Sequence, residues 1–188
     1  CQDTSWYNEK LNTSTRGSRR EFPSIAVIVA ETSRVIIFDG DDPNLPMWMT
    51  FEADRTPITW LSWYTSGTGT VNDLAALNGI MVWAQGGGAP LISFPGDDVR
   101  LSYSGSSEYE MIKRAIVYRN NAGGGQDVGG GDMISLNHYS CASVGMKVLP
   151  DDPIDPATGI PAPTILVGTA STGGITVIRG NRTSYNII

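Results

Sequence analysis

The sequence carries little charge and has only one histidine, and both scarcities exclude classes of protein. Of the 188 residues, 17% are charged and 40% are hydrophobic. Intrinsic disorder requires the opposite balance, so we expect a folded domain. The net charge is −6, and the one basic cluster is Arg16, Arg19 and Arg20. Because a nucleic-acid binder normally shows a basic stripe, no nucleic-acid partner is expected.

Long apolar runs and a cysteine framework are also missing. The longest apolar run covers residues 25–30, which is the length of a strand and far below the roughly 20 residues that cross a bilayer as a helix. No membrane span is therefore expected. Cys1 and Cys141 could pair, but two cysteines without metal-ligand spacing do not make a disulfide framework. The start at Cys1 is expected of a processed or partial chain, or of a mature bacterial lipoprotein.

Glycine and proline are abundant, with 22 and 11 residues. This composition suits many short strands joined by tight turns and is unfavourable to long helices. We predict a polar N-terminal arm or linker at residues 1–22 and one β-repeat domain at residues 23–188. Within that domain, the glycine-rich segment 120–131 is predicted as a mobile loop or a crossing between strands. The Pro/Asp-rich segment 150–163 is predicted as a stiffer connector.

An internal repeat is the most informative feature. Residues 23–40 align without a gap on residues 163–180, at a constant offset of 140 (163 − 23). Pro, Ile, Val, Ala, Thr and Gly coincide at matching positions, and most other apolar positions exchange similar residues. Each copy reads as an apolar strand, a turn and a second strand rich in β-branched residues.

A third, looser copy lies at residues 79–94 and follows an apolar run at residues 71–77. Asn78-Gly79 separates these runs, and this pair favours a type I′ hairpin turn because both central residues need positive φ. Further strands are predicted at residues 47–51, 58–64, 99–103, 115–118, 133–139, 144–149 and 183–188. Residues 108–114 could form either a helical turn or a strand.

Repeated antiparallel units of this kind predict an all-β fold of propeller-like blades. One meander cannot bury both of its faces, whereas copies stacked around an axis hide them. Propeller blades have four strands and about 40–45 residues. The spacing here is uneven and the sequence ends inside a predicted strand, so we expect part of a larger or multi-subunit assembly.

Several stretches resemble large virion proteins of tailed bacteriophages, particularly those of aquatic bacteria. They are residues 25–29 with 35–40, residues 71–83, and above all residues 148–178, where Val148-Leu149-Pro150 and residues 153–159 lead into the glycine-turn hairpin. The resemblance covers about residues 23–188. It implies a propeller-repeat protein with a structural role in the phage tail, such as a nozzle, hub or fibre component, and it supplies no catalytic residues.

Few residues form patterns that could carry chemistry. His138 lies in a predicted strand, where a hydrogen-bonded role is commoner than catalysis, and no Gly-x-Ser-x-Gly motif occurs. Asp39-Gly40-Asp41-Asp42 could hold Ca²⁺, but its spacing is not that of an EF-hand and suits a turn better. Asp97-Asp98 and Asp151-Asp152 repeat this loop chemistry. No cofactor, metal site or catalytic residue is therefore predicted.

Two further groups leave alternatives open. Glu108 and Glu110 would share one face of a strand and could act as a glycosidase pair, although a solvated face is commoner. Trp60, Trp63 and Tyr64 are candidates for contact with a glycan or another subunit, whereas most aromatic residues of such a fold fill its core.

The sequence thus favours a non-enzymatic structural protein of the virion, assembled with other virion proteins or with copies of itself. One alternative is a carbohydrate-binding propeller that recognises a host-surface glycan. Another is a secreted or lipoprotein binding module outside the cell.

Overall fold

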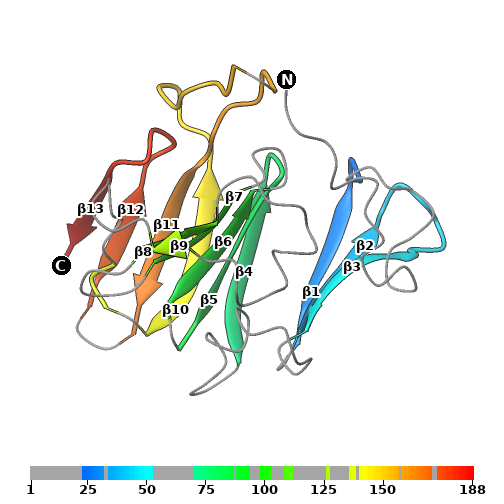
Figure 1. The fold of residues 1–188 in the computed structure, drawn as a ribbon, viewed down its shortest axis with the longest axis horizontal. Helices are drawn as coiled ribbons and strands as arrows, with labels where there is room; N and C mark the ends of the chain where they lie inside the picture. The colour runs from blue at the N-terminus through cyan, green and yellow to red at the C-terminus, as the bar shows by residue number, and fades with distance from the viewer. Residues whose placement is uncertain are drawn as a thin grey trace.

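The structure is a computed structural model, and every secondary-structure element that it describes is a β-strand. It describes residues 23–31, 34–52, 70–86, 88–93, 98–102, 108–111, 126–127, 136–138, 140–156, 158–170 and 173–188. All strand pairs within these residues are antiparallel (Figure 1). The predicted all-β antiparallel fold is confirmed.

The strands form three sheets, and in each sheet the strands follow one another in chain order. The first sheet contains β1 (Ala26–Ala30), β2 (Arg34–Asp39) and β3 (Met47–Glu52). The middle sheet contains β4 (Val71–Leu77), β5 (Ile80–Gln85), β6 (Ala89–Ser93), β7 (Asp98–Ser102), β8 (Glu108–Met111) and β9 (Gln126–Asp127). The last sheet contains β10 (Cys141–Lys147), β11 (Thr164–Thr169), β12 (Ile175–Ile178) and β13 (Ser184–Ile187).

The predicted Asn-Gly hairpin is confirmed in the middle sheet. Asn78 and Gly79 have φ values of 53° and 73°, and Leu77 pairs with Ile80 across the turn. The Asn78 side chain also donates a hydrogen bond of 2.8 Å to the carbonyl oxygen of Pro161. The turn residue therefore shapes the hairpin and ties it to the connector before β11.

Both gap-free copies of the repeat form antiparallel hairpins, β1–β2 and β11–β12. Their registers differ by two residues, because Ala30 pairs with Val35 whereas Gly168 pairs with Ile175. Gly174, which has φ of 72°, turns the chain early in the second copy, where the first copy has Arg34. Since strand side chains alternate with period two, a shift of two leaves equivalent residues on equivalent faces.

Three predictions need correction or completion. Residues 136–138 do not continue a strand, because the backbone N–H of Asn137 bonds to Thr176 Oγ1 at 3.1 Å and its amide bonds to the Gly173 carbonyl, which bends the chain. Residues 108–111 are strand β8 and not a helical turn. The short strand β9 lies inside the predicted loop 120–131 and pairs with β8. The predicted strands at residues 58–64 and 115–118 lie outside the described residues.

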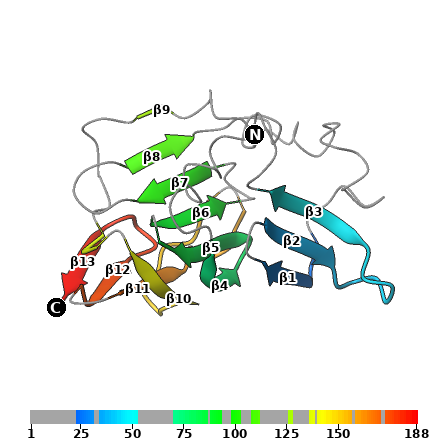
Figure 2. The same ribbon diagram turned by 90° about the horizontal axis from the view of Figure 1, so that it is seen from below.

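The three sheets lie in chain order, with the middle sheet between the other two (Figure 1). The first strands of the sheets lie close together, since β10 packs on β4 and β5 and β1 contacts β4. Seen from below, the later strands spread outward, so that β3, β9 and β13 lie at the periphery (Figure 2). The sheets therefore fan out from the side on which each one begins.

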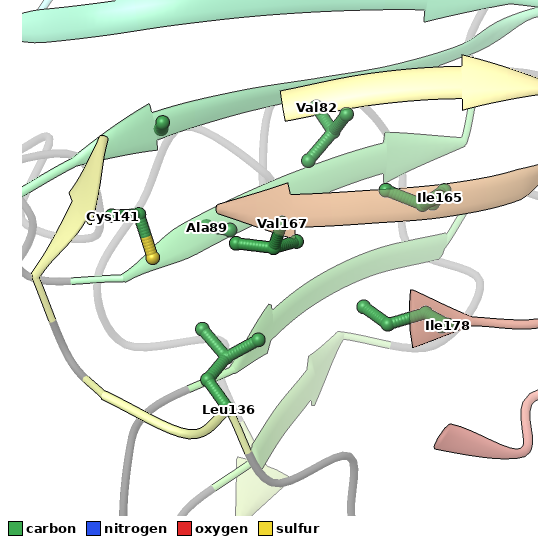
Figure 3. Packing of buried hydrophobic residues seen from close by; sticks show 8 residues of the cluster. Val82, Ala89, Leu136, Cys141, Ile165, Val167 and Ile178 are labelled. Carbon is green, nitrogen blue, oxygen red and sulfur yellow. The ribbon is translucent and has the colours of Figure 1, made fainter. Parts of the chain in front are cut away.

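A hydrophobic core lies between the middle and last sheets (Figure 3). Small residues of β5 and β6 meet branched residues of β11 and β12, and the cluster consists of Val82, Ala84, Ala89, Leu136, Cys141, Ile165, Val167 and Ile178. Trp48 and Trp83 are also fully buried, which confirms the expectation that aromatic residues fill the interior for these two. Burying an apolar side chain of Val or Ile size stabilises a fold by about 1.5–3 kcal/mol.

Candidate assembly interface

The side of the last sheet that points away from the middle sheet is apolar and exposed. Leu166, Val177 and Tyr185 are neighbours across β11, β12 and β13, and Ile175 pairs with Ile187 in the next row. Tyr185 and Ile187 are 50% and 52% exposed, and Leu166 and Ile175 are 44% and 43% exposed. We call Leu166, Ile175, Tyr185 and Ile187 the outer face of the last sheet. Contiguous apolar surface of this kind marks interaction sites.

The first sheet has a matching exposed side on β1. Val27 and Val29 alternate along β1 and therefore share one face, and Ile25 lies directly before the strand; the three residues are 40%, 38% and 61% exposed. We call these three residues the outer face of the first sheet. Ile36 of β2 pairs with Val29 on this side but is buried, and the opposite side of the sheet carries Val35 and Ile37, both fully buried.

Both outer faces include a strand at the edge of its sheet. In the described part of the chain, β1 pairs only with β2 and β13 pairs only with β12. Edge strands present backbone groups to any strand that can approach them. The two ends of the three-sheet stack thus offer apolar side chains beside unpaired strand edges.

The junction of β4 and β10 shows how this chain joins the edges of two sheets. Each strand has a register shift at this point. Asp73 Oδ2 accepts a 3.0 Å hydrogen bond from the backbone N–H of Val144, and Asn72 Nδ2 donates one of 2.8 Å to the carbonyl oxygen of Cys141. Our prediction did not single out Asn72-Asp73. The available signal was a polar pair inside an otherwise apolar strand.

Aspartate side chains organise the loops beside both hairpins. Asp41 accepts hydrogen bonds from the backbone N–H groups of Ser24 at 2.7 Å and Ile25 at 3.2 Å, and so holds the start of β1. Asp39 Oδ1 in turn accepts the backbone N–H of Asp41. These carboxylates act as the turn residues that the sequence favoured. The described residues contain no group of three or more His, Cys, Asp or Glu side chains that could hold a metal ion.

Asp152 has the corresponding position beside the second hairpin and is buried. Its carboxylate accepts hydrogen bonds from the backbone N–H of Leu149 at 2.7 Å, the N–H of Thr164 at 3.1 Å and the Thr164 hydroxyl at 2.8 Å. Burial alone would raise the pKa of Asp152, but these hydrogen bonds and the charge of Arg179 outweigh it and lower the pKa below its usual value. Arg179 also bonds to the exposed Asp151 at 2.5 Å. Asp151 and Asp152 therefore stabilise the loop that leads into β11.

His138 and Cys141 lie near each other in sequence, and each has a structural role in the described residues. His138 Nδ1 accepts the backbone N–H of Ser140 at 3.1 Å, as expected of a structural histidine. Cys141 is a buried thiol in the core, and burial raises its pKa to about 12. A thiolate nucleophile needs the opposite shift.

Glu108 and Glu110 lie on strand β8, two residues apart, so strand alternation puts both positions on one face, as predicted. The register sets Arg100 of β7 directly opposite Glu110.

Comparisons with known proteins find no relative. No protein-family model, no curated protein and no solved structure matches the chain. Among the described residues there is no helix long and apolar enough to cross a membrane. The candidate contact residues Trp60, Trp63 and Tyr64, the N-terminal arm 1–22, Cys1 and Asp97 lie outside the described residues. The candidate site is therefore built from the two outer faces.

Proposed function

We propose that this chain is a non-enzymatic structural component of a tailed-phage virion, located in the tail as part of a nozzle, hub or fibre. It acts by assembly with other virion proteins or with copies of itself. The observation that carries the proposal is the pair of exposed apolar faces at opposite ends of the sheet stack. Exposing an apolar sheet face to water costs free energy, and packing against a neighbouring sheet removes that cost.

We further propose that the three sheets are blades of a propeller-like assembly. Each sheet is an antiparallel meander in chain order, and the last sheet has the four strands of a propeller blade. The first strands lie together while later strands spread outward, as blades do around an axis (Figure 2). Propellers have about four to eight blades, so further sheets are needed to close a ring.

The tail assignment rests on the resemblance of residues 148–178 to propeller-repeat virion proteins. That run contains the connector, β11 and β12, and with them the buried Asp152 and the core residues Ile165 and Val167. The similarity therefore lies in the segment that builds one sheet and attaches it to its neighbour. Core and connector residues of this kind support a structural role.

The proposal is tested on purified particles of the phage whose genome encodes the chain. Mass spectrometry should find its peptides in particles that remain intact after density-gradient purification, in several copies per particle. Gold-labelled antibody should bind at the tail and not at the capsid. Peptides found only in the lysate, or label confined to the capsid, would refute the tail assignment.

A further inference from the structure

The two copies of the internal repeat differ in which side of the first strand they bury. In the second copy Ile165 and Val167 are 3% and 0% exposed. The equivalent residues of the first copy, Ile25 and Val27, are 61% and 40% exposed. These residues are identical in type, so the difference comes from their surroundings: β1 is an edge strand, whereas β11 lies between β10 and β12 and belongs to the core shared with the middle sheet.

The other side of the hairpin shows the reverse pattern on its second strand. Val35 of the first copy is fully buried, whereas its equivalent in the second copy, Ile175, is 43% exposed. Val177 is 4% exposed and so is buried like its equivalent Ile37, although Leu166 and Tyr185 beside it in the same row are exposed. The first copy therefore exposes the Ile-Val side of its first strand, and the second copy exposes Leu166 and Ile175 on the other side, whereas Ile36 and Val177 on these two sides are buried.

The second copy shows which sheet covers the Ile-Val side. Ile165 and Val167 belong to one buried cluster with Val82 and Ala89 of the middle sheet, which precedes the last sheet in the chain (Figure 3). The Ile-Val side of this hairpin thus packs on the preceding sheet of the stack. In the first sheet the same side has no preceding sheet among the described residues. Its counterpart at the other end is the last sheet, whose outer face has no following sheet there.

We propose that the outer face of the last sheet in one copy packs on the outer face of the first sheet in a second copy of this chain. This inference rests on the proposed assembly function and names its partner. The contact repeats between chains the packing that β11 makes on the middle sheet within the chain. Both faces consist of apolar side chains, Ile25, Val27 and Val29 on one and Leu166, Ile175 and Ile187 beside Tyr185 on the other, so neither partner buries a charge.

The contact joins two different surfaces and is therefore heterologous. A heterologous contact leaves one free face of each kind on every dimer, so that assembly continues until the subunits close a ring or form a filament. Because the sheets fan out around the side on which they begin, successive copies turn about a common axis. The expected product is a closed ring of few copies.

Sedimentation velocity on the full chain tests the contact with one charge on each face. Val27→Asp alters the first outer face and Ile187→Asp alters the last, while Ile154→Asp alters an exposed isoleucine of the connector that belongs to neither face. Wild type and Ile154→Asp should form the same oligomer. For each face variant, the concentration at which half of the chains are assembled should rise by roughly 100-fold, because an unpaired carboxylate would be buried in apolar surroundings.

Mixing the two face variants separates a head-to-tail contact from contacts between like faces. Each variant keeps one intact face, so an equimolar mixture should form a dimer of one copy of each and nothing larger. Loss of assembly in only one of the two variants would indicate a contact between like faces and would overturn the proposal. Native fluorescence of the buried tryptophans verifies folding, and Val29→Asp with Tyr185→Asp replaces any variant that fails this check.

The outcome is distinguishable from failure of the proposed function. A chain that stays monomeric at the highest soluble concentration, yet occurs in purified particles, would refute the head-to-tail contact and leave the virion role standing. A chain that forms the predicted oligomer but is missing from particles would refute the virion role and leave the contact standing.

Discussion

Asp152 provides the sharpest test of how the last sheet is attached to the connector. Its buried carboxylate accepts three hydrogen bonds, two from backbone N–H groups and one from the Thr164 hydroxyl. Asp152→Ala leaves these donors without their acceptor in an interior position. A buried donor without a partner costs about 1–3 kcal/mol. The hydroxyl can rotate toward another acceptor, so we expect a total loss of about 3–5 kcal/mol in the free energy of unfolding.

The neighbouring Asp151→Ala is the matched control. Asp151 is paired with Arg179 at 2.5 Å, but its side chain is 73% exposed. Exposed ion pairs contribute about 0–1 kcal/mol. Urea denaturation followed by the fluorescence of the buried Trp48 and Trp83 measures both variants. Equal losses for Asp152→Ala and Asp151→Ala would refute the reasoning.

The same residue predicts a pH dependence. Since hydrogen bonds and Arg179 lower the folded-state pKa of Asp152, its contribution to stability is complete above the unfolded-state pKa of about 3.9 and is lost as the pH falls through the folded-state pKa. Wild type should therefore lose its advantage over Asp152→Asn in acid, below about pH 4. A stability advantage that stays constant from neutral pH to pH 2 would contradict the lowered pKa of Asp152.

Three further perturbations probe the sheets. A Cβ at Gly40 would lie 2.7 Å from the carbonyl oxygen of Ile25, whereas one at Gly145 meets nothing within 4 Å; Gly40→Ala should lower the free energy of unfolding by about 1–3 kcal/mol in urea titration, and Gly145→Ala should not. Asp73→Ala should cost about 1–3 kcal/mol because it removes the acceptor for a backbone N–H of β10, and an unchanged urea midpoint would contradict this junction. Burial raises the pKa of Cys141 from 9.0 to about 12, so its alkylation by iodoacetamide near pH 8 should be roughly 1000-fold slower in the folded than in the unfolded chain; labelling at similar rates, located by peptide mass spectrometry, would contradict the burial.

The sequence was sufficient to predict the class of fold, because strand and turn signals are local. Alternating apolar residues and the Asn78-Gly79 pair predicted hairpins that the structure contains. The close approach of another backbone segment explains the glycine that both copies share. Gly40 is approached by the carbonyl oxygen of Ile25, and the equivalent Gly180 is approached even more closely by that of Ala162, so a side chain at either position would displace the backbone.

The contacts that bend the chain and join the sheets beside the candidate site could not be predicted, because they depend on distant segments. The apolar run at residues 133–139 resembles a strand, but Asn137 finds partners at Thr176 and Gly173, more than thirty residues away, and the chain bends. Likewise, Asn72 and Asp73 are ordinary polar residues until β10, about seventy residues later, supplies backbone groups for them.

The sequence alone cannot distinguish buried from exposed surfaces when the same motif occurs twice. Ile25 and Ile165 occupy the same position of the same motif and have the same side chain, yet one is exposed and the other is buried. Because both copies carry an apolar residue on each side of the hairpin, each is suited to be an interior sheet of a stack. A sheet at the end of a stack then keeps an apolar side that water contacts, unless another sheet covers it. The exposed side of β1 and the outer face of the last sheet are therefore surfaces of the kind that an interior-type repeat exposes where no sheet covers it, and a second copy is the neighbour that we propose for both.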